Sequence, residues 1–378
     1  MENNTTDAII VNPALSQHPP PNQTAAQFSK EKTWLATSVI LIAMIIAIVV
    51  GNVLVLVTTW LDKRLHQPNK YFVACLAVAD LLVGVFSVPI RLHLHLNETT
   101  LAPIYLCRFW TWMDISCEVA SIATLTIISI DRYFKISHPF EYRSRMSTSR
   151  SVFIISTIWL ISGVHATLGL FPYGDSHGVV ALVGRGCIID NKIYLTVTSA
   201  IFFFIPLLIM LVMYCLVFTV AHAQQKRNRK GKLGRTMSSR RRKSVNKEFY
   251  QELKTVRMLL LVVGAFTICW MPFFVLFFLV TYSPEYLPTS RYFQQILGTI
   301  CIVILPSLNS LCNPVIYACF DREYSSAFKR LFKMVLSCKM SSGRERYSSA
   351  TQSLSPNTRS NVETQIIFTP AAGCSMLD

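Results

Sequence analysis

Seven long apolar blocks constrain what this chain can fold into more than any other feature. Each block holds about 20 or more largely apolar residues, the length that an α-helix needs to cross ~30 Å of hydrocarbon. We therefore predict an all-α membrane protein, a bundle of seven transmembrane helices with the two chain ends on opposite sides of the bilayer. The blocks are residues 33–60, 69–94, 104–134, 151–172, 190–222, 253–282 and 292–319.

The basic residues predict how the bundle is oriented. The chain has 36 Lys and Arg against 20 Asp and Glu, and the excess gathers in the loops that follow the first, third and fifth blocks. The densest run is KRNRKGKLGR at 226–235, followed by RRRK at 240–243. Basic loops stay in the cytoplasm, so we expect a multi-pass plasma-membrane protein with an extracellular N-terminus and a cytoplasmic C-terminus. A nucleic-acid patch is the lesser interpretation of these runs.

Four regions are expected from this pattern. They are an extracellular glycosylated tail at 1–32, the bundle at 33–319, an amphipathic helix at 320–338 and a disordered cytoplasmic tail at 339–378. The sequons on the predicted outside make Asn3, Asn4, Asn22 and Asn97 candidates for N-glycosylation. At the end of the amphipathic helix, Cys338 suits S-palmitoylation.

Two cysteines are expected to form a disulfide bond. Of the 11 cysteines, Cys107 and Cys187 are the two that fall on the predicted outer face. Because that side is oxidising, we expect them to pair and to join the loop before the fifth helix to the start of the third.

The third block carries charge where charge is costly. Asp114, Glu118 and Ser121 lie within roughly 60° of one another on a helix, so they form one polar stripe. Asp114 is 17 residues from Asp131, which places it ~25 Å from the cytoplasmic end and near the outer mouth of the bundle. Such residues should face the interior of the bundle. No catalytic constellation appears, so we expect a binding protein and not an enzyme.

Each of the seven predicted helices carries a characteristic motif. These motifs are GNVLV with Asn52, LAVADLL with Asp80, Cys107 followed by Asp131-Arg132-Tyr133, Trp159, Pro206 with Tyr214, CWMPF with Trp270 and Pro272, and NPVIY with Asn313, Pro314 and Tyr317. With these motifs the chain resembles the rhodopsin-like (class A) G-protein-coupled receptors, and within them the aminergic branch. The resemblance implies a receptor that binds a ligand from outside and activates a heterotrimeric G protein.

The resemblance also implies roles for residues at the cytoplasmic end and at mid-membrane. Arg132 would pair with Asp131 and with Glu252 until the sixth helix swings outward. Further activation residues would be Tyr133, Tyr214, Phe266, Pro314 and Tyr317. An allosteric sodium ion, which prefers a carboxylate and neutral oxygens, would be held by Asp80, Ser121, Asn309, Ser310 and Asn313.

The resemblance makes Asp114 the partner of a protonated amine in an aromatic cage. The other residues implied for the ligand site are Thr198, Ser199, Phe202, Trp270, Phe273, Phe274 and Ser307. The alternative is that Asp114 pairs inside the protein, for instance with Arg91. The chain departs from the aminergic pattern at Ile304 and Ser307, where Trp and Tyr are usual, and at Phe202. A lipid, nucleoside or peptide ligand, or an orphan receptor with high basal activity, therefore stays open.

Glu118 is a second departure, because this position is usually small or neutral in the family. Three interpretations stay open. Glu118 is protonated and hydrogen-bonded, it pairs with a cation of the protein, or it receives a second basic group of the ligand.

Intracellular partners are also implied. The run RRRKS makes Ser244 a candidate site for a basophilic kinase, with lipid binding by the basic run as the alternative. The polar, Ser-rich tail is expected to be phosphorylated by receptor kinases and to bind arrestin.

Overall fold

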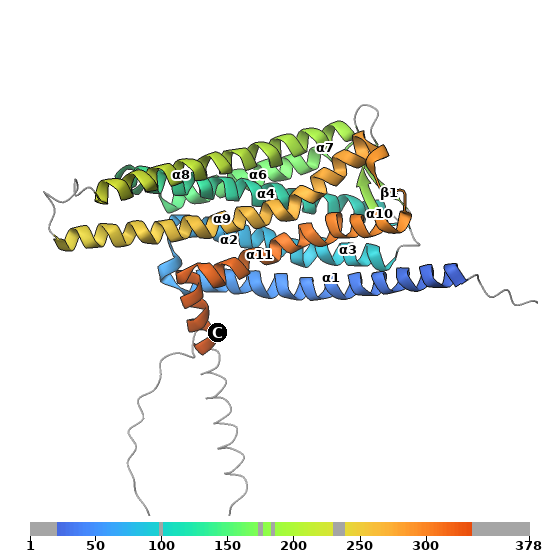
Figure 1. Ribbon diagram of the computed structural model, residues 1–378, viewed down its shortest axis with the longest axis horizontal. Helices are drawn as coiled ribbons and strands as arrows, with labels where there is room; N and C mark the ends of the chain where they lie inside the picture. Colours follow the sequence, from blue (N-terminus) through green and yellow to red (C-terminus); the bar gives the residue numbers. More distant parts are fainter. Residues whose placement is uncertain (1–20, 98–100, 173–176, 183–185, 230–238, 335–378) are drawn as a thin grey trace, which may run out of the picture.

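The computed structural model describes residues 21–97, 101–172, 177–182, 186–229 and 239–334, without the side chains of residues 21–30, 143, 221, 224–229, 239–255 and 291. Among the described residues, seven helical spans are long and apolar enough to cross a membrane, which confirms the predicted bundle. They run side by side along the long axis of the molecule (Figure 1). The spans are Glu31–Leu61, Pro68–Leu96, Ile104–Ser137, Thr148–Leu168, Lys192–Val220, Val256–Tyr282 and Tyr292–Phe320.

The spans are built from helical elements that differ from the predicted blocks mainly at their ends. The first helix starts at Pro21, inside the predicted tail, and proline is well suited to a first helical turn. The fourth ends at Leu168, four residues early, where Gly169 and then Pro172 follow. The α-helices are α1 (Pro21–Leu61), α2 (Pro68–Leu82), α3 (Val88–Leu96), α4 (Ile104–Ser137), α5 (Pro139–Arg145), α6 (Thr148–Leu168), α7 (Lys192–Ser199), α8 (Ile205–Arg229), α9 (Ser239–Tyr282), α10 (Arg291–Gly298) and α11 (Leu305–Phe320). Short 3₁₀ turns lie at η1 (Lys63–Leu65) and η4 (Pro284–Tyr286).

Three spans contain a wide, π-helical turn. These turns are η2 (Val83–Ser87), η3 (Ala200–Phe204) and η5 (Thr299–Ile304). Each is followed two residues later by a proline, namely Pro89, Pro206 and Pro306. Proline lacks the amide donor and crowds the preceding turn, so the chain widens just before it. The turn η3 lies just before Pro206, whereas Pro272 lies inside the continuous helix α9.

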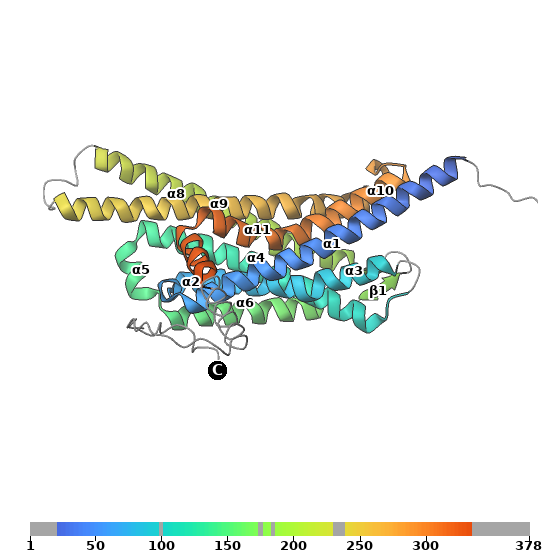
Figure 2. The ribbon, with the colours of Figure 1, turned by 90° about the horizontal axis from the view of Figure 1, so that it is seen from below.

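A two-stranded hairpin and a disulfide bond mark one end of the bundle, which we call the disulfide end. Strands β1 (Val179–Leu182) and β2 (Gly186–Ile189) pair antiparallel, and Gly178 before them has a φ of 75°. Cys187 on β2 is bonded to Cys107 at the start of α4, as predicted. The short helix α5 lies at the opposite end, which we call the Arg132 end (Figure 2).

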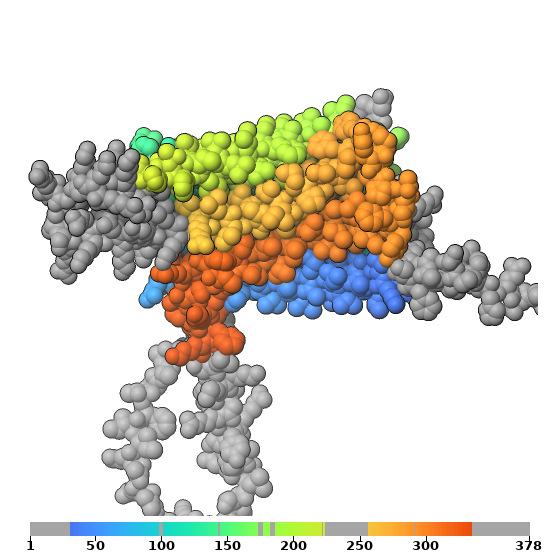
Figure 3. Space-filling view, in the orientation of Figure 1, coloured from blue at the N-terminus to red at the C-terminus, as the bar shows by residue number. Residues whose placement is uncertain are grey.

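The core of the bundle forms around α4, the most buried of the described spans. It contacts α2, α6, α8 and α9. Helix α1 approaches α11 closely at Gly51, where an added Cβ would lie 2.8 Å from Cγ of Pro314. On one face of the bundle α8, α9, α11 and α1 lie side by side (Figure 3). Large apolar side chains are exposed on the bundle surface, such as Trp60 on α1 and Phe153 on α6. An exposed apolar surface of this kind is what a bilayer covers.

After α11 the chain turns at Asp321, and residues 322–334 form a helix that leaves the bundle axis at an angle (Figure 1). The buried Tyr324 on this helix stacks on Tyr317 of α11, with ring centroids 5.7 Å apart, and its hydroxyl lies 3.0 Å from that of Thr59. Cys338 lies outside the described residues.

Candidate functional site

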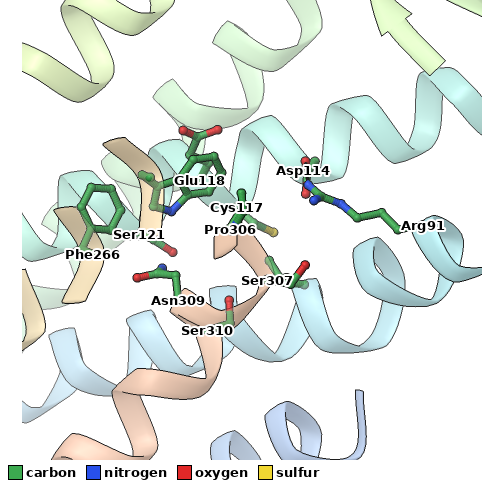
Figure 4. Close-up of a pocket in the computed structure, with 12 residues that line it drawn as sticks. Arg91, Asp114, Cys117, Glu118, Ser121, Phe266, Pro306, Ser307, Asn309 and Ser310 are labelled. Carbon is green, nitrogen blue, oxygen red and sulfur yellow. Dashed lines mark hydrogen bonds and ion pairs between the residues drawn. The ribbon is translucent and has the colours of Figure 1, made fainter. Parts of the chain in front are cut away.

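A cavity between α3, α4, α9 and α11 brings together residues of the predicted ligand site and of the predicted sodium site (Figure 4). Its volume is about 20 Å³, which is room for a water molecule or a small ion. A larger ligand must therefore displace side chains to enter. The lining residues are Val83, Arg91, Asp114, Cys117, Glu118, Ser121, Phe266, Trp270, Pro306, Ser307, Asn309 and Ser310.

Asp114 is paired inside the protein. Its Oδ2 accepts a hydrogen bond of 2.6 Å from Nη2 of Arg91, and its Oδ1 accepts one of 2.5 Å from the hydroxyl of Ser87. Both partners lie on the second span, four residues apart. The structure thus forms the internal pair that the sequence offered as the alternative, and the role of Asp114 as an amine anchor stays a prediction.

Arg91 is itself held by three groups, two from α4 and one from η5. Besides Asp114, its Nη1 donates a hydrogen bond of 2.6 Å to the carbonyl oxygen of Ile302 in η5. Its guanidinium also lies over the Trp110 ring, 5.4 Å from the centroid. Figure 4 shows the side chain reaching from its own helix to Asp114. The wide turn η5 contributes here, because it places a backbone oxygen within reach of a side chain.

Glu118 lies one helical turn deeper than Asp114 and lines the same cavity. It is half-buried, and within the described part of the chain its carboxylate makes no hydrogen bond and no ion pair. The interpretation in which Glu118 pairs with a cation of the protein therefore has no support in the described contacts. The cavity holds one guanidinium and two carboxyl groups.

Aromatic side chains pack around the inner part of this cavity. The centroid of the Trp270 ring lies 6.4 Å from the ring centroid of Phe266, 5.7 Å from that of Phe273 and 6.2 Å from that of Phe274. Ser307, the remaining predicted residue on α11, lines the cavity and donates its hydroxyl to the carbonyl oxygen of Val303. Trp270 and Ser307 thus line the same cavity as the two carboxyl groups, whereas Phe273 and Phe274 do not line it and pack on the Trp270 ring.

Thr198 lies elsewhere. Its hydroxyl is 3.1 Å from Nε2 of His165, in a second cavity of about 460 Å³ between α6 and α7 on the surface of the bundle. The Phe202 ring packs on the His165 ring, with the two centroids 4.2 Å apart. Ser199 is buried, and its hydroxyl donates a hydrogen bond to the carbonyl oxygen of Leu195. The structure does not bring these three residues to the cavity of Asp114.

The predicted sodium site forms one continuous polar region with that cavity. Asp80 is fully buried, and Nδ2 of Asn313 donates to its Oδ2 at 2.7 Å. Its Oδ1 has no hydrogen-bond partner among the described residues. Ser121, Asn309 and Ser310 line the adjacent cavity. An unpaired buried carboxylate oxygen beside neutral oxygens fits a hard monovalent cation.

At the Arg132 end, Arg132 and Asp131 are buried and form an ion pair of 3.2 Å. Asp131 also accepts a hydrogen bond of 2.8 Å from the hydroxyl of Tyr142 on α5. Ser129, one turn away, donates to the hydroxyl of Tyr214 at 3.1 Å. The pair with Asp131 is thus formed. The side chain of Glu252, on α9, lies outside the described residues, and the predicted pair with it stays a prediction.

Comparison with known proteins decides the family. The model of the 7 transmembrane receptor (rhodopsin family) matches residues 51–317, which is most of the chain. The chain belongs to the rhodopsin family of seven-transmembrane receptors. This family consists of receptors and is not enzymatic.

Curated relatives of this receptor include aminergic ones. A probable G-protein coupled receptor, No18, from Amphibalanus amphitrite is 28% identical, with 82% of this chain and 94% of the relative covered. The 5-hydroxytryptamine receptor 7 of Xenopus laevis is 30% identical, with 84% and 80% covered. The alpha-1A adrenergic receptor of Rattus norvegicus is 30% identical, with 78% and 67% covered.

The remaining predicted activation residues lie in the core of the receptor. Phe266 and Tyr317 are buried, Tyr133 is half-buried beside Phe134, and Pro314 packs against Gly51.

Asn97 is exposed at the end of α3, where its amide donates to the carbonyl oxygen of His93. Asn3 and Asn4 and the side chains of Asn22 and Ser244 lie outside the described residues, so their predicted modifications stay predictions.

Sequence reasoning missed Ser87 as a partner of Asp114, and Trp110 and the carbonyl group of Ile302 as partners of Arg91. The four-residue spacing of Ser87 and Arg91 was a usable signal, because it places both side chains on one face of a helix. Trp110 is likewise four residues before Asp114. No sequence pattern signals the contribution of Ile302, since it depends on the wide turn η5.

Proposed function

We propose that this receptor binds a small protonated amine in the cavity beneath Arg91 and passes the signal to a heterotrimeric G protein at the Arg132 end. The observation that carries the proposal is the charge of the cavity. Two carboxyl groups and one guanidinium line it, so with both carboxyl groups ionised one negative charge is uncompensated. A buried charge of this kind is costly unless a partner neutralises it, and a ligand cation is such a partner.

The surroundings of the cavity support an aromatic amine. Trp270 and Phe266 line its inner part and offer ring faces to an ammonium group or ring edges to an aryl group. A receptor for 5-hydroxytryptamine and an adrenergic receptor are among the relatives that are 30% identical to this chain.

The orientation proposed for the receptor puts the disulfide end outside the cell, at the plasma membrane. A disulfide bond is formed at that end, and such bonds persist in oxidising compartments. The basic residues Lys63 and Arg64 follow the C-terminal end of α1, at the end of the bundle opposite the disulfide bond. The positive-inside rule expects such residues in the cytoplasm.

The experiment is a panel of biogenic amines applied to cells that express the wild-type receptor, with cAMP and calcium as readouts. The matched variant is the double substitution Asp114→Asn with Glu118→Gln, which removes both negative charges of the cavity. Arg108→Gln is the control, because Arg108 is an exposed charge on the same helix. We expect at least one amine to act on wild type and on the control and to fail on the double variant at equal surface expression. Signalling by a neutral ligand, or basal signalling that no amine changes, would contradict the amine assignment.

A further inference from the structure

The two carboxyl groups of the cavity differ in what they already bind. Both oxygens of Asp114 accept short hydrogen bonds, from Arg91 at 2.6 Å and from Ser87 at 2.5 Å. Glu118 makes no hydrogen bond and no ion pair to any described residue, although it lines the same cavity. An ammonium group that approached Asp114 would have to replace a guanidinium that is already in place.

Arg91 is difficult to displace, because it is fixed on three sides. Its guanidinium contacts Asp114, the carbonyl oxygen of Ile302 and the face of Trp110 at once. These partners come from α4 and η5, so the pair also joins the third and seventh spans. A planar guanidinium is well suited to several simultaneous hydrogen bonds and to stacking on a ring, and an ammonium group of a ligand does not reproduce that set.

We infer that Glu118, and not Asp114, holds the cation of the ligand, and that Arg91 is the permanent internal counterion of Asp114. The inference rests on the amine proposed above and names the residue that binds it. The ammonium group lies one helical turn, ~6 Å, deeper than in a receptor that uses the upper carboxylate. It lies at the level of Trp270, while the rest of the ligand extends toward Arg91 and Trp110.

This position defines the chemical class of the ligand. The pair of Arg91 with Asp114 is neutral as a whole, so Glu118 in its ionised form gives the cavity a single negative charge, which balances one ammonium group. The narrow cavity between Cys117, Pro306 and Ser307 favours a small head group. A monoamine with an aromatic body and a primary ammonium group meets both conditions.

The test compares amines with alcohols of the same shape, so that only the charge of the ligand differs. The probes are 5-hydroxytryptamine with 5-hydroxytryptophol, and tyramine with tyrosol, bound to the purified full-length receptor in lipid nanodiscs. The measured quantity is the affinity ratio of amine to alcohol. The two key variants are Glu118→Gln and the paired substitution Arg91→Gln with Asp114→Asn, which removes the internal pair without leaving a lone charge.

We expect wild type to prefer the amine by about 30-fold or more, as for a charge pair shielded from water. Glu118→Gln should bring the ratio to about one, and the paired variant should keep it within about threefold of wild type, since Glu118 remains. If Glu118→Gln fails to fold, Glu118→Asp replaces it. The shortened side chain should lower the affinity for the amine about tenfold and leave the affinity for the alcohol unchanged.

The opposite outcomes separate the two proposals. If the paired variant loses the preference and Glu118→Gln keeps it, or if Glu118→Asp binds the amine like wild type, the inference is overturned while the amine receptor stands. If neither amine binds wild type better than its alcohol, the assignment of an amine and of its anchor fall together.

Discussion

Lys70 on α2 donates a hydrogen bond of 2.9 Å to Asp321, the residue between α11 and the helix formed by residues 322–334. Both side chains are buried, and Lys70 also lies 2.9 Å from Glu323 and over the Tyr324 ring. One cation from the second span therefore fixes the start of the last described helix.

Lys70→Met should loosen that helix. It removes the counterion of a buried carboxylate, and breaking a buried pair in this way costs about 3–5 kcal/mol. We expect a lower midpoint in thermal unfolding of the purified receptor. Lys329→Met, on the exposed face of the same helix, is the control and should leave the midpoint unchanged. Equal midpoints for both variants would show that the pair contributes no stability.

Arg91→Gln should strengthen amine binding, by about tenfold, because it frees Asp114 as a second carboxylate for the ligand. The measurement is competition binding with the same amine that acts on wild type. The exposed Arg108, on α4 at the same end of the bundle, provides the control Arg108→Gln. A loss of amine affinity in Arg91→Gln would mean that the guanidinium contacts the ligand directly.

Asp80→Asn should remove the effect of sodium on the receptor. Asp80 is the one acidic residue among the five predicted to hold the ion, and its Oδ1 has no hydrogen-bond partner among the described residues. Without that charge a cation loses most of its attraction. We expect NaCl to raise the thermal stability of wild type more than KCl at equal ionic strength, and the variant to respond equally to both salts. A sodium-specific shift that persists in the variant would place the ion elsewhere.

Gly51→Val should separate α1 from α11. An added Cβ at residue 51 would meet Cγ of Pro314 at 2.8 Å, and forced overpacking of a core costs about 1–3 kcal/mol. Gly264→Ala is a suitable control, because an added Cβ there has open space and alanine favours the helix. The midpoint of thermal unfolding should fall for the first variant and stay equal or rise for the second.

Cys187→Ser should release the β1–β2 hairpin from the start of α4. Loss of a native disulfide bond costs about 2–5 kcal/mol. We expect wild type in reductant to behave like the variant, with a lower unfolding midpoint in both. The free, exposed Cys215 offers the control Cys215→Ser. An unchanged midpoint in Cys187→Ser would show that the hairpin is held by packing alone.

The spans, the disulfide bond and the depth of Asp114 could be predicted from the sequence, because each depends on local hydrophobicity, compartment or helical rise. The partner of Asp114 could not be chosen, since the contact with Arg91 depends on how two helices are rotated against each other. Thr198 was assigned to the ligand site by the resemblance alone, and the structure places its hydroxyl beside His165 instead. That contact depends on how the fourth and fifth spans pack together, which a motif does not specify.

The wide turns also bear on which sequence changes such a receptor tolerates. A π-helical turn holds one more residue than a regular one. Deleting a single residue within η3 would restore a regular α-helix and rotate α7 by about 100° relative to α8. That rotation would present a new set of α7 side chains to the neighbouring helices and leave the Arg132 end undisturbed. Single-residue deletions at η2, η3 and η5 are therefore a route by which relatives could acquire different ligands on one signalling scaffold.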